Sequence, residues 1–412
     1  MTKAKENPSD YYLDRLQDLP SINKTREANA AAWRNFLSVE EYVEREHVLG
    51  LSKIASSETN RVLVFGLKNK SDPSTIVSSV ELLVRESWRF HKTADGSVAR
   101  KSVLSGCVGG VYTDPSHRGK GYASIMIDKL MQIAKTPDVL GEDGFVFLYS
   151  EVGEYYARNG FKSFHVPLAN IPLVAQNKPY EKPENVDLVK YHEFAPLFEE
   201  YNAHFDSEMR EKTATDGLDR ITINPTADYI DWYHLRLKFF VAKLYEQHIK
   251  FDGYRDSYDD LVAKFLSIQP HYYGMILRCP ETGDSQGFIV WHYEYDFDKE
   301  TEKPKNYVTI LKIHVDTTRA NYDSVAFQLI ANLKNYVEAD HGIPQLANFH
   351  KIVLWESEVS SKVLRDLRKF FQSVDGLNNS SLGAISFVNE EDDSRLKKGE
   401  ILWENNNKLP WF

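Results

Sequence analysis

The stretch DPSHRGKGYASIMIDKL, residues 114–130, joins a proline turn to an apolar helix, with two glycines and two basic residues at the junction. Glycine leaves the backbone open to close approach, and the first N–H groups of a helix have no partners within that helix. With the positive end of the helix dipole behind them, such groups bind phosphate. The sequence therefore predicts an anion site at 118–123 and a helix whose apolar side, including Met126, Leu130 and Ala134, lies on a sheet.

Two common phosphate motifs do not fit this junction. A Walker A loop requires Gly-Lys-Ser/Thr, but Lys120 is followed by Gly121. A dinucleotide fingerprint requires a third glycine, and this chain has Ser124 at that position. The pattern that remains is Arg-x-x-Gly-x-Ala, with Arg118, Gly121 and Ala123 at the fixed positions.

This pattern resembles the Q/R-x-x-G-x-G/A motif of the GNAT superfamily, the acetyl-CoA-dependent N-acetyltransferases. A second motif, Tyr156-Ala-Arg-Asn-Gly160-Phe161, resembles the Y-x-x-x-G-F that follows the fifth strand in that superfamily. The resemblance implies acetyl-CoA as co-substrate. It assigns the pantetheine arm to Val111, Tyr112 and Thr113, and the pyrophosphate to Arg118, Gly119, Lys120, Gly121, Tyr122 and Ala123.

Acyl transfer to an amine needs a base for the ammonium and a proton for the departing thiolate. By resemblance, Tyr156 is the general acid. Many relatives carry a glutamate on the fourth strand, but SVLSGCVGGVYT (102–113) contains no carboxylate. Glu81 and Glu86 on the preceding strand are alternatives for the base, and a solvated strand face is the ordinary role of such side chains.

The chain ends in NNNKLPWF, an apolar segment after an asparagine run. Certain multidomain members of the superfamily end in an aromatic residue whose main-chain carboxylate serves in the active site. By this resemblance we expect the α-carboxylate of Phe412 to enter the first domain's cleft as base or amine orienter. A tail that only packs on the core is the alternative.

Composition bounds the remaining possibilities. At 412 residues, with 42% apolar and 13% aromatic side chains, the chain can build two domains. The net charge of −10 argues against a nucleic-acid partner. Cys107 and Cys279 are too few for a disulfide framework or zinc site and favour a reducing compartment. The first thirty residues lack an apolar signal core, and no run of about 18 apolar residues occurs, so we expect a cytoplasmic protein with no membrane partner and no metal.

The same order of elements is predicted twice. The first half has strand patterns at 61–67, 75–87, 102–113, 145–151 and 161–166 and helix patterns at 26–48, from 122 and at 152–160. The second half has strand patterns at 272–278, 286–295, 306–316, 351–357, 383–388 and 400–404 and helix patterns at 188–205, 227–268, 322–339 and 359–372.

From first to fourth strand, Val62–Val146 and Tyr273–Ile352 span similar lengths, which indicates an internal duplication. The predicted fold is α+β, with two GNAT-like mixed-sheet domains in tandem. Residues 1–170 form the catalytic, acetyl-CoA-binding domain, and 171–187 form a linker. Residues 188–412 form a degenerate copy whose tail reaches the active site.

The second copy lacks the glycines of the first. Its corresponding segment, VDTTRANYDSV (315–325), has side chains where a pyrophosphate needs bare backbone, so we expect no coenzyme there. The acidic, aromatic run WHYEYDFD (291–298) can line a site for a cationic amine, or it is a half-exposed strand.

Two GNAT-like halves and the Leu-Pro-Trp ending resemble the fungal lysine N6-acetyltransferases of lysine degradation. The resemblance implies a small-molecule acceptor, free L-lysine, and N6-acetyl-L-lysine as product. An arginine suits the substrate carboxylate, and Arg85 and Arg89 are candidates. The alternatives are another amine (a polyamine, an aminoglycoside-like amine or a protein lysine) or a non-catalytic acyl-CoA-binding protein. The sequence does not fix the oligomeric state.

Overall fold

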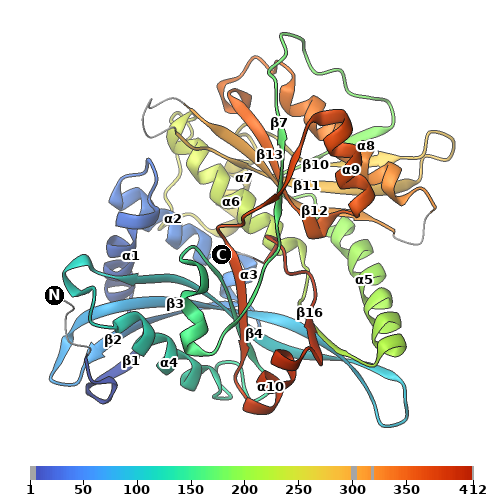
Figure 1. The fold of residues 1–412 in the computed structure, drawn as a ribbon. Coiled ribbons are helices and arrows are strands. Elements are labelled where there is room, and N and C mark those ends of the chain that lie inside the picture. The colour runs from blue at the N-terminus through green and yellow to red at the C-terminus, as the bar shows by residue number, and fades with distance from the viewer. Residues whose placement is uncertain (1–5, 298–303, 317–319, 411–412) are drawn as a thin grey trace.

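The computed structural model describes residues 6–297, 304–316 and 320–410. Two mixed β-sheets with their helices occupy the lower and upper parts of Figure 1, and the chain crosses between them more than once. Within the described residues, sheet A has nine strands and sheet B has seven. None of the described helices is long and apolar enough to cross a membrane.

Sheet A is built mainly from the first half of the chain. Across the sheet, its strands are β1 (Tyr11–Leu16), β2 (Arg61–Asn69), β3 (Asp72–Lys92), β4 (Val98–Thr113), β5 (Phe145–Ser150), β15 (Leu382–Phe387) and β6 (Lys162–Phe164). Two further strands extend it, because β9 (Asp219–Ile223) pairs with β3 and β16 (Ile401–Trp403) pairs with β9.

Sheet B is built mainly from the second half. Its strands, in order, are β8 (Val186–Lys190), β10 (Tyr272–Arg278), β11 (Ser285–Glu294), β12 (Asn306–Val315), β13 (Phe349–Trp355), β7 (Leu168–Pro172) and β14 (Val374–Leu377).

The two sheets share one plan of strand order and direction. The first four strands of each pair antiparallel, the fourth and fifth run parallel (β4 with β5, β12 with β13), and the last two are antiparallel again. A helix connects the parallel strands in both halves. The predicted fold class, α+β with two GNAT-like mixed sheets in tandem, is confirmed.

Each sheet also contains one strand from the other half. β7 follows β6 in the chain, yet it lies between β13 and β14 of sheet B. β15 follows β14, yet it lies between β5 and β6 of sheet A. The boundary predicted at residue 170 falls inside β7, and the range 171–187 holds the end of β7 and the start of β8. The stretch is a strand because its alternate residues Ala169 and Ile171 are fully buried in sheet B.

Helices cover both faces of the sheets. They are α1 (Leu19–Trp33), α2 (Val39–Gly50), α3 (Lys53–Ser56), α4 (Tyr122–Ala134), α5 (Ala195–Asp216), α6 (Ala227–Leu244), α7 (Tyr258–Phe265), α8 (Tyr322–Glu338), α9 (Ser361–Phe371) and α10 (Glu390–Lys398), together with the 3-10 helix η3 (Gly153–Asn159). Along β5, Phe145 and Phe147 join the core shared with α6, while Val146 and Leu148 join the core under α4. This strand is buried throughout because both of its faces are covered.

Most predicted elements are present, with two long helix predictions divided. The helix predicted at 26–48 is α1 and α2, because Asn35 adopts a φ of 52° and Ser38 starts a new helix through a capping box with Glu41. The helix predicted at 227–268 is α6 and α7, and Ser257 caps the second with Asp260. The helix predicted from 188 begins at Ala195, since β8 occupies the preceding residues.

Candidate active site

The parallel strands of sheet A separate just beyond their last pair, Val108 with Leu148. The pairing of β4 with β3 shifts by one residue there, so β4 carries a bulge at Gly110 and Val111. Gly110 has a φ of 57°, which glycine adopts without a steric penalty. The opening between β4 and β5 is therefore bordered by backbone of β4 that is not paired with β3.

The predicted anion loop lies between β4 and α4. Gly119 and Gly121 have φ values of 87° and 92°, and Gly121 precedes the first helical residue. Among the described residues no side chain caps this end of α4. The first bond of the helix runs from the Ile125 N–H to the Gly121 carbonyl, so the three N–H groups before it lack an intrahelical acceptor. This geometry fits a phosphate group.

Side chains of the loop are held by the surrounding protein. The Lys120 ammonium forms an ion pair with Glu6 at 3.1 Å. Arg118 donates from Nε to the Thr113 carbonyl at 2.9 Å, and Tyr122 is buried. These contacts fix the loop at the end of β4, where Gly119 is exposed and Gly121 is partly exposed.

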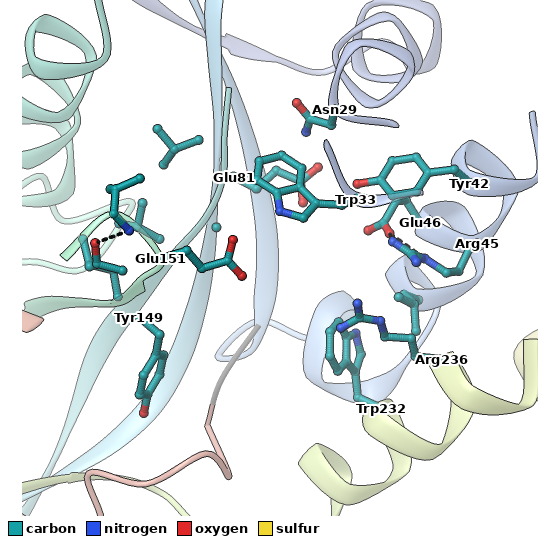
Figure 2. Close-up of a pocket in the computed structure, with 18 of the residues that line it drawn as sticks. Asn29, Trp33, Tyr42, Arg45, Glu46, Glu81, Tyr149, Glu151, Trp232 and Arg236 are labelled. Carbon is teal, nitrogen blue, oxygen red and sulfur yellow. Dashed lines mark hydrogen bonds and ion pairs between the residues drawn. The ribbon is translucent and has the colours of Figure 1, made fainter. Parts of the chain in front are cut away.

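A pocket of about 250 Å³ lies at the opening of the two strands (Figure 2). Helices α1, α2 and α6 form the side of the pocket that faces the strands in Figure 2. It is lined by Asn29, Trp33, Tyr42, Arg45, Glu46, Leu49, Glu81, Val108, Gly109, Gly110, Val111, Leu148, Tyr149, Ser150, Glu151, Val152, Tyr156, Trp232 and Arg236.

Tyr156 lines this pocket from η3 and is nine-tenths buried. Burial, with added repulsion from Tyr155 and Glu151, raises the pKa of Tyr156 to about 12, so its hydroxyl is protonated at neutral pH. Asn159, at the end of η3, donates to the Ser124 carbonyl on α4 at 3.1 Å. The tyrosine and the anion loop are therefore fixed relative to each other through α4.

Buried carboxylates form part of the pocket wall. Glu81 of β3 lies 3.5 Å from Arg26, and burial together with the Glu46 charge raises the pKa of Glu81, although Arg26 opposes the shift. Glu46 accepts from Arg45 Nε at 2.9 Å. Burial disfavours the charge of Glu46, but Arg45 and Arg26 outweigh it and hold its pKa below the usual value.

Arg236 and Arg45 lie on the helix side of the pocket, which they share with Glu46 of α2. Arg236 of α6 points its guanidinium toward the open space in Figure 2 and packs over the Trp232 ring. It forms no hydrogen bond or ion pair with the described residues. Burial, with added repulsion from Arg45, lowers its pKa below the usual value of an arginine. Arg45 Nη1 and Asn29 Oδ1 are buried and lack partners in the described part of the chain. These unsatisfied polar atoms are available to a polar ligand.

The segment before the C-terminal residues passes beside this pocket. Tyr149, which lines the pocket, donates its hydroxyl to the Asn407 carbonyl at 2.8 Å. Tyr233 of α6 donates to the Lys408 carbonyl at 2.6 Å, and Leu409 is buried. The described part of the tail is thus clamped between β5 and α6, whereas Phe412 lies outside the described residues.

The structure brings only some of the predicted coenzyme residues to the pocket. Val111 lines the pocket with Tyr156, while Tyr112 packs against the Trp33 ring, 6.2 Å between centroids. The Thr113 hydroxyl lies 2.8 Å from Ser78 Oγ. The remaining residues, 118–123, lie past the end of β4 and are not part of the pocket lining.

Three residues considered from sequence have other contacts. Arg85 is fully buried and donates to the Ile54 carbonyl. Arg89 pairs with Asp219 and Asp392. The remaining residue of the three, Glu86, accepts from side chains outside the pocket. The pocket residues of α1, α2 and α6 were not predicted. The sequence signal that could have indicated them is the i, i+4 spacing of Trp232 and Arg236, which places both on one face of a helix.

Comparison with known proteins agrees with this fold. Residues 72–161 match the Acetyltransferase (GNAT) family, so the chain is an acetyltransferase of the GNAT class. Residues 170–412, more than half of the chain, match the family described as LYC1 GNAT-like C-terminal domain. The protein belongs to that family.

Two relatives span nearly the whole chain. An uncharacterized protein of Saccharomyces cerevisiae is 28% identical over 460 residues, covering 99% of this chain and 100% of its own. A protein of Yarrowia lipolytica named lysine acetyltransferase is 24% identical over 452 residues, covering 95% and 97%. A solved GCN5-related N-acetyltransferase from Anabaena variabilis is similar at a TM-score of 0.48, with 11% identity over 92% of this chain and 73% of that one.

Proposed function

We propose that this protein transfers the acetyl group of acetyl-CoA to the side-chain amine of free L-lysine, giving N6-acetyl-L-lysine for lysine degradation in the cytoplasm. The observation that carries the proposal is a single pocket with Tyr156 and a buried carboxylate on the strand side and the unpaired guanidinium of Arg236 on the helix side. The relative named lysine acetyltransferase supports the choice of acceptor.

In the proposed complex, the anion loop holds the coenzyme's pyrophosphate. Backbone amides from Gly119 to Ala123 contact the phosphate oxygens, and the start of α4 contributes its dipole. The pantetheine arm lies along β4, where the bulge at Gly110 leaves backbone groups unpaired. The thioester then reaches the pocket that Val111 and Tyr156 line.

The proposed chemistry moves three protons. Glu81, whose raised pKa makes it a stronger base than an ordinary glutamate, takes a proton from the lysine ammonium. The free amine attacks the thioester carbonyl, a C–N bond forms, the C–S bond breaks, and the second proton that the nitrogen loses restores the Tyr156 hydroxyl after Tyr156 has acted as acid. Tyr156 donates its hydroxyl proton to the leaving thiolate, because its high pKa keeps that proton in place at neutral pH.

The proposed specificity comes from the substrate's carboxylate. Arg236 and Arg45 Nη1 offer charged donors on the wall formed by α6 and α2, at the side away from the strands. L-Lysine presents a carboxylate and a distal amine. Cadaverine is the same molecule without the carboxylate, so it tests this assignment directly.

The test is a coupled assay of thiol release with L-lysine and with cadaverine. We expect the wild-type enzyme to prefer L-lysine. We expect R236Q to raise the KM for L-lysine by about 10- to 100-fold, the value of one charged hydrogen bond, while cadaverine turnover stays unchanged. R255Q, at an exposed site outside the pocket, is the matched control.

The variant Y156F tests the reaction itself. We expect it to lower kcat by about 100-fold or more with unchanged acetyl-CoA affinity. Equal kcat in wild type and Y156F would contradict the assigned acid. Preference for cadaverine or another polyamine would replace lysine as acceptor. The role of the Phe412 carboxylate stays a prediction, supported here by the position of the segment that precedes it.

A further inference from the structure

Three side chains of types that can ligate a metal ion meet where α5 packs on sheet B, outside the pocket. Glu200 and His204 are one helical turn apart on α5, and His314 comes from β12. Their ligand atoms all lie within 4.8 Å of one another. His204 Nδ1 and His314 Nε2 are 3.0 Å apart.

The donor set is that of a transition-metal site. Two imidazoles and one carboxylate are ligands that Zn²⁺ and Co²⁺ take, whereas Ca²⁺ and Mg²⁺ favour all-oxygen sites. Ligands bonded at about 2.0–2.1 Å in a tetrahedron lie about 3.3 Å from one another, close to the spacing of the two nitrogens. Three protein ligands leave the fourth position to water.

The surroundings hold the central ligand rigidly. His314 is buried, and its ring contacts those of Tyr201 and Phe288, with centroids 5.1 and 5.4 Å away. The nearby cation, Lys312, is paired with the buried Glu358 at 3.4 Å, so its charge is compensated. The His314 ring is therefore held in place, and an ion would replace its hydrogen bond with His204.

The cluster lies where α5 meets both sheets. One to two turns further along, α5 is bonded to the β3–β4 hairpin of sheet A, through Arg210 to the Val98 carbonyl at 2.9 Å and through the Asp206–Arg100 ion pair at 2.8 Å. We propose that Glu200, His204 and His314 bind one divalent transition-metal ion of the zinc type, which fastens α5 to sheet B and so braces the two sheets against each other.

The test is titration of the metal-stripped full chain with Co²⁺, followed by visible absorption, and displacement by Zn²⁺. We expect one Co²⁺ per chain. We expect H204Q to weaken binding by more than about 100-fold, beyond what the loss of an outer partner causes, and E200Q to weaken it less. Zn²⁺ raises the melting temperature of wild type but not of H204Q.

Glu200 and His204 are exposed, so their variants keep the fold, and melting without metal checks this. The buried H314Q variant is a second measurement. The matched control is H165Q, which removes an exposed histidine 3.1 Å from Glu154 that has no third ligand among the described residues. Equal Co²⁺ binding by wild type and H204Q, or an equal loss in H165Q, overturns the proposal. Acetyl transfer is not part of the readout, so the outcome is independent of the proposed reaction.

Discussion

The two sheets have the same strand order but differ at the point where their parallel strands separate. In sheet A, the second residue after the last β4–β5 pair is Gly110; in sheet B, the second residue after the last β12–β13 pair is Leu311. Both positions lie in a bulge. Next to it, β3 has Glu81, while β11 has the fully buried Trp291.

At Lys312 and Ile313 the opening of sheet B is filled by the protein itself, while a pocket lies beside Thr309, Val353 and Trp355. Glu358 accepts from the Ile313 N–H at 3.1 Å and pairs with Lys312, while Asn407 of the tail donates to Glu358. Backbone that is free in sheet A is thus satisfied internally in sheet B. The same strand order therefore gives an open site in sheet A and a more closed one in sheet B. The difference comes from the larger side chains of Leu311 and Trp291 and from the buried carboxylate of Glu358.

The largest effect is expected from separating the halves. We expect residues 1–180 alone to give no cooperative unfolding transition, because β5 and β6 lose the β15 strand between them and β7 loses sheet B. Circular dichroism melting and gel filtration measure this. Co-expression with residues 181–412 should restore a folded complex. A fragment that melts cooperatively and binds coenzyme would show that the exchange of β7 and β15 between the two sheets is dispensable.

The next effect is on Glu81, which stands on sheet A where sheet B has Trp291. We expect E81Q to lower kcat by about 100-fold or more, as for the loss of a general base. In wild type, kcat/KM should fall as pH drops through a value above 4.5, since the pKa of Glu81 is raised and the base must be deprotonated. Tyr156 should produce no alkaline loss until pH approaches about 12. A pH profile of both enzymes checks this. E86Q, on the same strand but outside the pocket, should retain activity, and a profile that E81Q leaves unchanged would reject Glu81 as base.

A smaller effect is expected from opening the filled cleft of sheet B. We expect E358Q to reduce the free energy of unfolding by about 3 kcal/mol, because the buried Lys312 ammonium loses its counter-charge. Glu358 also accepts a hydrogen bond from Asn407 of the tail. Denaturant unfolding should therefore show the lower free energy of unfolding. Acetyl-CoA affinity should stay within about twofold, since the coenzyme site is in sheet A. A large loss of affinity would mean that the closed cleft takes part in coenzyme binding.

The smallest effect is expected at the anion loop of sheet A. Gly121 has a φ of 92°, so G121A forces a side chain into the left-handed region at about 1–2 kcal/mol and should weaken acetyl-CoA binding about tenfold. G141A is the matched control, because Gly141 has a φ of 75°, open space around its Cα, and no place in the loop. Calorimetric titration compares them. Equal affinities would argue against phosphate binding at Gly121.

Most regular elements could be predicted because they follow from local pattern. The apolar runs at β10, β11 and β12 and the stripe of α4 were predicted to within a few residues. The short strand β7 was not, since Asn170 and Pro172 are typical of loops and only pairing with β13 makes the stretch a strand. In the candidate site too, only the residues that belong to local motifs could be predicted. Tyr156 and the glycine loop follow from sequence motifs, but Arg236 comes from a helix about 80 residues further along.

The sequence by itself determined the local conformations, because a glycine with positive φ, a helix start and an apolar stripe depend on neighbouring residues alone. It also determined that the second copy lacks the glycines of the first. Only the tertiary structure decided which strands complete which sheet and which polar groups face the pocket. Contacts between residues far apart in the chain depend on burial shared by many side chains, and no short stretch of sequence records that burial.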